Sequence, residues 1–236
     1  MKLAIVGFGT VGQATQRTLK KGFMNDVEFG VHAPDRNLHG TWQDADIIFI
    51  CTPTDIVKEY LDVVPQEKHH DIIIRSTIDF AILGDEFMSA GVWPEFLTER
   101  TWLEDSRNPI CNVFGGSAKQ LKLLKDITIF DNFYHTKPKI AALMKVATNS
   151  FYTMKVTFAN VLKDIAGDGY HELQKTLVQD PRMAADIHFQ VPGPDGQYGY
   201  GGKCFPKNLE IFKEFSNDAN FVATMIDMLN KKYRSK

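Results

Sequence analysis

Short apolar runs alternate with mixed polar stretches along the first half of this chain of 236 residues. Continuous apolar runs bounded by Gly, Pro or charged residues are typical of buried parallel strands, and the amphipathic stretches between them indicate helices. We expect strands at Lys2–Val6, Val27–Val31, Ile47–Cys51 and Asp71–Arg75, and weaker ones at Cys111–Phe114 and Ile127–Phe130. The alternation predicts an α/β fold with a doubly wound, mostly parallel sheet.

The pattern changes at about Pro138, from which one helix is predicted to run to Ala166. At about 1.5 Å per residue such a helix is some 44 Å long, so we expect it to join two lobes. Spacings of three and four residues predict a buried stripe along it, formed by Ile140, Leu143, Met144, Ala147, Phe151, Met154, Phe158, Val161 and Ile165. Further helices are predicted near His171–Val178, Asn208–Phe215 and Ala219–Tyr233.

The first predicted strand is followed directly by Gly7-Phe8-Gly9-Thr10-Val11-Gly12, which opens a helical stretch. Glycines in this order allow a tight turn, close approach of backbone to a pyrophosphate, and close packing of helix on strand. The start of the chain therefore reads as a Rossmann-type dinucleotide-binding unit. We expect residues 1–136 to form this domain, and residues 137–236 to form a smaller, all-helical domain for dimerisation.

Polar residues follow several predicted strands, where ligands of such sheets bind. Thr52-Pro53-Thr54, Ser76-Thr77 and Pro94-Glu95 are expected to face one crevice, although each is also a plausible cap or turn. His32 ends the second strand, where an acidic residue would normally hold the ribose of NAD. Asp35 is an alternative ribose ligand, and the nearby Arg36 leaves NADP open beside the predicted cofactor, NAD.

The composition narrows the choice of partners. With 27 basic and 29 acidic residues the formal net charge is −2, so no basic field indicates nucleic acid or a membrane surface. No apolar run approaches the ~20 residues of a membrane span. Cys51, Cys111 and Cys204 are an odd number without metal-ligand spacing, so we predict no metal site, no disulfide framework and a cytoplasmic location.

The segment Gly199-Tyr200-Gly201-Gly202-Lys203-Cys204-Phe205-Pro206-Lys207 is the most specific candidate for chemistry. Glycines let backbone approach a ligand, and the flanking ammonium groups favour thiolate, the form of cysteine that attacks carbon. The sequence therefore predicts a nucleophile at Cys204. The alternative is a small apolar residue in a glycine-rich turn.

Two further pairs are spaced by four residues. Lys145 and Asn149 project from one face of the long helix and are suited to stabilise an oxyanion. β-Hydroxyacid dehydrogenases share this pair, so it does not choose between two families. Glu95 and Glu99 lie among apolar residues, which suits a general base that activates water. An exposed lysine and two solvated glutamates are the alternatives.

Taken in order, these motifs resemble the UDP-glucose/GDP-mannose dehydrogenase family. The glycine turn is similar to the family's opening, and the cysteine segment is similar to its catalytic loop. The motifs between them are Ser76-Thr77, Pro94-Glu95-Phe96-Leu97, Lys145 with Asn149, and Asp180-Pro181-Arg182.

The resemblance implies oxidation of a nucleotide-sugar C6 alcohol to a carboxylate with two NAD, through a thiohemiacetal and a thioester. The catalytic residues it implies are Cys204, Lys145, Asn149, Glu95, Thr77 and Asn208. Cofactor contacts are expected from Gly7, Gly9, Thr10, Val11, Gly12, His32, Thr52, Pro53, Thr54, Ser76, Thr77, Glu99 and Lys207. Substrate contacts are expected from Glu95, Phe96, Leu97, Glu99, Lys145, Asn149, Arg182, Tyr198, Tyr200 and Gly201.

The sequence also departs from the family. Family members carry a C-terminal domain that binds much of the nucleotide, whereas this chain reads as a short form. Asn208 stands where the family has Asp. Replacing that charged residue by Asn would impair proton transfer at the catalytic lysine. A two-electron β-hydroxyacid dehydrogenase and a non-catalytic, nucleotide-binding homologue are therefore kept as alternatives. A homodimer is expected, because the long helix is strongly apolar and Arg182 resembles an arginine that acts on the neighbouring subunit's substrate.

Overall fold

The computed structural model describes residues 1–78, 89–181, 183 and 188–236. The chain divides into two compact units, Met1–Lys145 and Val146–Lys236. Helix α6 (Pro138–Ala166) crosses the boundary between them, so its first turns belong to the first unit and the remainder to the second. The assignment of cofactor binding and dimerisation to separate domains stays a prediction.

The first unit is built on a sheet of eight strands in the order β3-β2-β1-β4-β5-β6-β7-β8. All neighbouring strands run parallel except β3 beside β2 and β7 beside β6. The predicted fold class is confirmed. The strands are β1 (Lys2–Val6), β2 (Glu28–Ala33), β3 (Leu38–His39), β4 (Ile47–Ile50), β5 (Ile72–Ile74), β6 (Gly91–Val92), β7 (Val113–Gly115) and β8 (Tyr134–Thr136).

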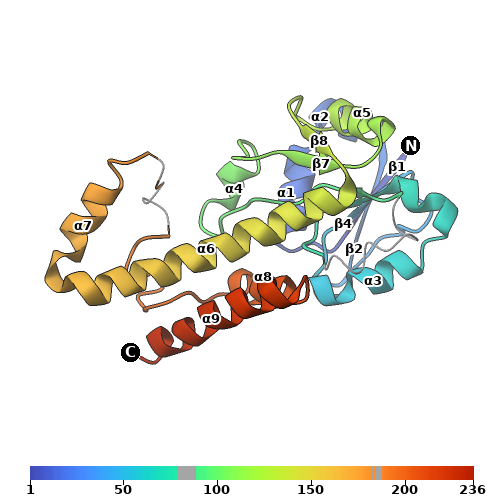
Figure 1. Ribbon diagram of the computed structural model, residues 1–236. Coiled ribbons are helices and arrows are strands. Elements are labelled where there is room, and N and C mark those ends of the chain that lie inside the picture. The colour runs from blue at the N-terminus through green and yellow to red at the C-terminus, as the bar shows by residue number, and fades with distance from the viewer. Residues whose placement is uncertain (79–88, 182, 184–187) are drawn as a thin grey trace. The chain divides into compact units, whose positions relative to one another are not determined.

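The central strand β1 buries both of its faces. Leu3 and Ile5 enter one apolar cluster, and Ala4 and Val6 enter another on the opposite face. Helices α1 (Thr10–Thr18) and α5 (Ala118–Ile127) cover the first cluster, while α3 (Thr54–Asp62) and the start of α6 cover the second (Figure 1). Burial on both faces explains the continuous apolar runs. The unit also contains α2 (Lys21–Asn25) and α4 (Trp102–Asp105).

The weak strand predicted at Ile127–Phe130 is wrong. Ser117 and Gln120 form a reciprocal capping box that starts α5, and the helix continues through Ile127. Leu124 and Ile127, three residues apart, are buried on one helix face. The strand of this region lies later, as β8. A short apolar run has no period that separates strand from helix, which is why the sequence pattern at Ile127–Phe130 is ambiguous.

The second unit contains the rest of α6, α7 (Tyr170–Leu177), α8 (Cys204–Lys213) and α9 (Asn217–Arg234). Leu209 of α8 and Ile226 of α9 share a core cluster with Tyr200 and with Val156 of α6. Helix α8 begins four residues before its predicted start at Asn208, since Pro206 falls in its first turn, where proline is tolerated. Cys204 is consequently the first residue of a helix rather than the last part of a loop.

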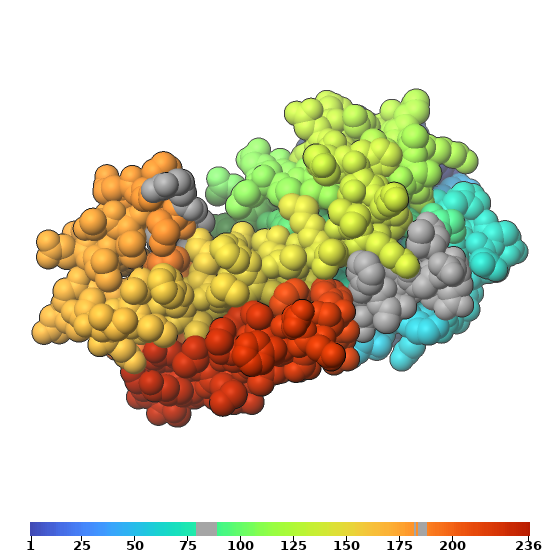
Figure 2. Space-filling view, in the orientation of Figure 1, coloured from blue at the N-terminus to red at the C-terminus, as the bar shows by residue number. Residues whose placement is uncertain are grey.

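The helix predicted from Pro138 to Ala166 is confirmed, but the burial of its apolar stripe is not. Ile140, Phe151, Met154, Phe158 and Ile165 are exposed, with Phe151 at 57% and Ile165 at 77%. Figure 2 shows part of α6 at the surface above α9. The spacing identified one face of the helix correctly, whereas the surface that would cover this face is not supplied by the described chain.

Among the described residues, no helix combines the length and the apolar character that a bilayer crossing requires.

Candidate active site

The glycine turn has the shape that a dinucleotide pyrophosphate requires. Gly7 has φ +87°, and a Cβ on Gly12 would lie 2.1 Å from the Gly7 carbonyl oxygen, so both positions need glycine. A Cβ on Gly9 would meet no atom within 4 Å, so the turn is open on that side. Gly9 is also the N-cap of α1, and no side chain caps the first N–H groups of the helix. Open glycine backbone at an uncapped helix N-terminus fits a phosphate group.

Hydrogen bonds join the polar residues that follow β4 and β5, while the crevice expected to include Pro94-Glu95 stays a prediction. The Ser76 hydroxyl donates to the Thr52 carbonyl oxygen at 2.7 Å, and the Thr54 hydroxyl donates to the Thr77 carbonyl oxygen. Thr52 Oγ1 is buried without a hydrogen-bond partner among the described residues. These residues lie at the carboxyl edge of the sheet, as does the glycine turn after β1.

His32, at the predicted ribose position, belongs to an aromatic cluster. Its ring lies 5.8 Å from that of Trp42 and 6.0 Å from that of Tyr60. Its carbonyl oxygen accepts the N–H of Gly7, which ties the end of β2 to the glycine turn. Arg36, the candidate ligand for a 2′-phosphate, lies 4.0 Å from the Asp35 carboxylate.

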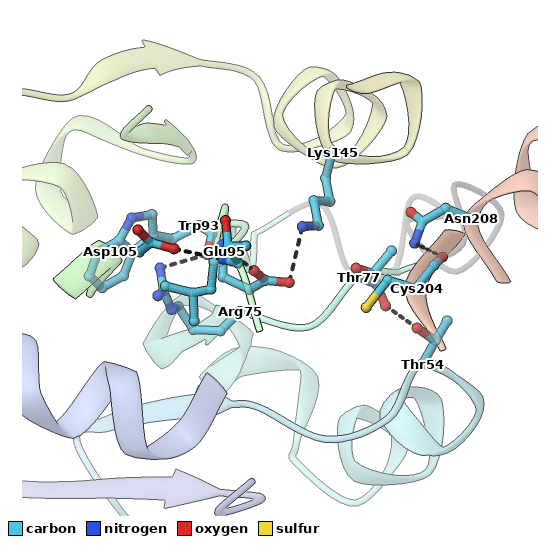
Figure 3. A network of polar contacts seen from close by, with 11 residues as sticks. Thr54, Arg75, Thr77, Trp93, Glu95, Asp105, Lys145, Cys204 and Asn208 are labelled. Carbon is cyan, nitrogen blue, oxygen red and sulfur yellow. Dashed lines mark hydrogen bonds and ion pairs between the residues drawn. The ribbon is translucent and has the colours of Figure 1, made fainter. Parts of the chain in front are cut away.

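Lys145 and Glu95 form the most buried salt bridge of the described chain. The Lys145 ammonium lies 3.1 Å from Glu95 Oε1, and the two side chains are only 8% and 11% exposed. Figure 3 shows Lys145 pointing from α6 toward this carboxylate. Glu95 Oε2 also accepts the N–H of Leu97, and the ammonium lies 5.3 Å from the centre of the Phe96 ring. The Pro94–Leu97 segment is therefore held against α6 by charge.

Arg75, which follows β5 directly, was not among the predicted site residues. Arg75 is buried and donates to Thr15 Oγ1. It also stacks 3.8 Å from the centre of the Trp93 ring and donates to the Trp93 carbonyl oxygen (Figure 3). Burial lowers the pKa of its guanidinium to about 10. The available signal was a charged residue at the end of a buried apolar run, which normally needs a partner.

Cys204 and Asn208 lie one helical turn apart in the second unit. Cys204 is exposed and is the first residue of α8. A helix N-terminus stabilises negative charge, so this position favours a thiolate. The Asn208 amide donates to the Cys204 carbonyl oxygen at 2.8 Å, and its Oδ1 is buried without a partner among the described residues (Figure 3). An aspartate in place of Asn208 could not make this donation when ionised.

The remaining residues predicted to contact the substrate or the cofactor differ in their burial. Asn149 is buried one helical turn after Lys145, and Glu99 is exposed. Tyr200 buries its ring in the core cluster of the second unit and is 4% exposed, while Tyr198 is half-buried. Arg182 lies outside the described residues. The substrate contacts assigned to these side chains stay predictions.

Comparison with known proteins finds relatives of this chain in one family of dehydrogenases. Residues 139–232 match the model of the UDP-glucose/GDP-mannose dehydrogenase family, central domain. The GDP-mannose 6-dehydrogenase of Pseudomonas aeruginosa is 26% identical over 70% of this chain and 45% of its own length. The UDP-glucose 6-dehydrogenase of Rickettsia conorii is 30% identical over 71% of this chain and 44% of its own length. The chain is similar to members of the UDP-glucose/GDP-mannose dehydrogenase family. It spans about half the length of the curated relatives it matches.

Solved structures share the fold. A UDP-glucose dehydrogenase from Pyrobaculum islandicum superposes with a TM-score of 0.70 at 19% identity, over 98% of this chain and 68% of that one. The 3-hydroxyisobutyrate dehydrogenase of Mycobacterium tuberculosis reaches 0.67 at 14% identity, over 99% of this chain and 94% of that one. NAD is the cofactor of the UDP-glucose/GDP-mannose dehydrogenases, and the open glycine turn fits its pyrophosphate.

We expect Glu95 and Lys145 to be strongly coupled. In a double-mutant cycle of Glu95→Gln and Lys145→Met, the coupling free energy should be about 1–3 kcal/mol, because either single change leaves a buried polar or charged group without its partner. Urea unfolding of the four proteins measures it. The exposed pair Lys122 and Asp126, also a salt bridge, is the matched control, and its coupling should not exceed about 0.5 kcal/mol. Equal coupling free energies in both pairs would contradict the conclusion that Glu95 and Lys145 form a strongly coupled buried salt bridge.

Proposed function

We propose that this chain carries the catalytic part of an NAD-dependent nucleotide-sugar 6-dehydrogenase, which oxidises a C6 alcohol to a carboxylate. The observation that carries the proposal is Cys204, an exposed thiol on the first residue of α8, directly after a glycine-rich turn. The family match supports it. A two-electron alcohol oxidation needs no such nucleophile. A four-electron oxidation can use one, because addition of a thiolate converts the aldehyde to a tetrahedral species that can lose a second hydride.

Bound NAD would accept one hydride in each of the two oxidations. In the first oxidation, a base on the protein accepts the proton of the alcohol as the carbonyl forms. The Cys204 thiolate then adds to the aldehyde carbon, giving a thiohemiacetal. Loss of the second hydride leaves a thioester on Cys204. Water attacks this thioester, releasing the carboxylate and restoring the thiol.

Lys145 and Asn149 are assigned to the oxygen on which negative charge develops. A buried ammonium and an amide N–H are effective there, because a low local dielectric strengthens both interactions. Glu95 is assigned as the base that activates water for thioester hydrolysis, with Thr77 assisting. Its salt bridge to Lys145 would let a proton pass between the two groups during the cycle. Asn208 is assigned to the first turn of α8, where it holds the Cys204 carbonyl.

A second candidate is a β-hydroxyacid dehydrogenase, which requires Lys145 and Asn149 but no cysteine. The spacing of these two residues, which such enzymes share, supports it. A homologue that binds nucleotide without turnover is the third candidate. A cytoplasmic location remains a prediction of the proposal.

We also propose that a second copy of this chain covers the exposed face of α6. Ala147, Phe151, Met154 and Phe158 follow one another at spacings of four, three and four, and the series is exposed. This is the spacing by which paired helices pack their side chains together. One continuous face of this kind can pair with itself about a two-fold axis.

Gly9→Ala should weaken binding of NAD at least about tenfold, since the added methyl group enters the open side of the turn where the pyrophosphate is expected. Thermal stability should change little, because the new Cβ meets no atom within 4 Å. Gly22→Ala, equally unobstructed but in α2, is the control and should keep both properties. Calorimetric titration measures the affinities, and the parent should bind NAD more tightly than NADP. Unchanged NAD affinity in Gly9→Ala would show that NAD does not bind at the glycine turn.

A screen of UDP- and GDP-sugars should give two NADH for each sugar oxidised, and Cys204→Ala should reduce the rate to below about 1% of the parent. Mass spectrometry of the parent with substrate and NAD should show an adduct on the peptide that contains Cys204. Cys111→Ala, which alters a partly buried thiol, is the control. One NADH per substrate with activity retained in Cys204→Ala would support the hydroxyacid dehydrogenase. Binding of NAD without turnover on any substrate would support the non-catalytic homologue.

Light scattering at micromolar concentration should give the mass of a dimer. Phe151→Glu combined with Phe158→Glu should give a monomer, because a pair of helices cannot bury these charges without partners. Ile110→Glu changes a residue that is 81% exposed in the first unit and should leave the dimer intact. A monomeric parent, or a dimer that survives the double change, would refute this interface.

A further inference from the structure

The turn that precedes Cys204 is held by two buried asparagines from different helices. The N–H of Gly199 donates to Asn160 Oδ1 of α6 at 3.0 Å. The N–H of Tyr200 donates to Asn230 Oδ1 of α9 at 2.7 Å, and Asn230 Nδ2 donates back to the Tyr200 carbonyl oxygen at 3.0 Å. Asn230 therefore pairs with both backbone groups of one residue, as a neighbouring strand would.

Neither asparagine is explained by the helix in which it lies. Asparagine is a poor residue for a helix interior, and an amide taken out of water costs free energy unless it is hydrogen-bonded. Asn160 is 1% exposed and its Nδ2 donates to the Val156 carbonyl oxygen, which orients Oδ1 toward the turn. Both side-chain amides thus form hydrogen bonds with the backbone that leads to Cys204.

The glycines of the turn fit closely against α9. Gly199 has φ +73°, and a Cβ there would lie 2.4 Å from Asn230 Oδ1. A Cβ on Gly201 would lie 2.3 Å from the Arg234 guanidinium. Arg234 in turn donates to Asp195 Oδ2 at 2.7 Å. The last turns of α9 therefore contact the loop at Asp195 and again at Gly199 and Gly201, a few residues before the cysteine.

We propose that Asn160 and Asn230 are positioning residues that fix the first turn of α8 and so maintain the reactivity of Cys204. The inference deepens the proposed function, since it concerns the nucleophile assigned there. Cys204 lies only four residues after Tyr200, so the hydrogen bonds to Gly199 and Tyr200 fix the backbone close to the start of α8. If the turn loosens, the first N–H groups of α8 lose their alignment and the thiolate loses the stabilisation of the helix N-terminus.

The test measures the rate at which iodoacetamide alkylates Cys204 over a range of pH, by mass spectrometry, in the full chain. Asn230→Ala and Asn160→Ala should slow the reaction about three- to tenfold at neutral pH and raise its pH midpoint by about half a unit to one unit. Access is not limiting, because Cys204 is exposed. The other two thiols do not interfere, since burial raises the pKa of Cys51 to about 11 and also raises that of Cys111.

Tyr170→Phe is the matched control. Its hydroxyl donates to the Phe189 carbonyl oxygen in another cluster of the second unit, so the change also removes a buried hydrogen bond to a loop backbone. It should lower the melting temperature and leave alkylation unchanged. If the asparagine variants lower stability as Tyr170→Phe does but keep the parental rate and midpoint, the two residues are structural and the proposal is wrong.

The same variants separate this inference from the proposed function. With a turned-over substrate, Asn230→Ala should lower kcat and leave the affinity for NAD unchanged, because the glycine turn for NAD lies in the other unit. If the parent shows no turnover, the proposed function fails while the alkylation data still decide the role of the asparagines. Partial recovery of rate and midpoint in Asn230→Asp, which keeps the acceptor for the Tyr200 N–H, would support the positioning role.

Discussion

Burial of the central strands on both faces is the constraint on which the first unit depends. Leu3 and Ile5 need a cover on one side of the sheet, and Ala4 and Val6 need one on the other. Parallel strands meet this need through crossover helices, which brings the carboxyl ends of β1, β4 and β5 to one edge. The glycine turn, Thr52 and Ser76 meet there because they follow those strands, not because of any attraction between them.

The same packing explains how a lysine comes to be buried. Ala141 and Ala142 at the start of α6 are buried against the cluster that Ala4 and Val6 enter, which fixes the helix rotation. One turn later Lys145 is carried into an environment that disfavours an isolated charge. Glu95 supplies the opposite charge from a segment without regular structure, and its second oxygen is held by the Leu97 N–H. The apolar contacts of α6 therefore set the position of Lys145, and Glu95 compensates the charge that is buried there.

In the second unit the roles are reversed, since polar groups shape a segment that has no regular hydrogen bonding of its own. Asn160 and Asn230 pair with the backbone of the turn before Cys204, while Tyr200 anchors it by burying its ring. Cys204 then begins α8. The exposed Cys204 is thus preceded by a segment whose backbone is held by hydrogen bonds from two helices.

The sequence alone determined the parallel sheet, the glycine turn after β1, the limits of α6 and the segment that holds Cys204, because each depends on local spacing or on residue types with narrow conformational preferences. It assigned the Ile127–Phe130 run to a strand, since a short apolar run has no period that separates strand from helix. It called the α6 stripe buried, because spacing reports a shared face and not what covers that face. Only the tertiary structure decided that Lys145 meets Glu95, that Arg75 stacks on Trp93, and that Asn160 and Asn230 hold the turn before the cysteine. Those pairings join residues far apart in the chain, and their geometry is set by packing that no local pattern encodes.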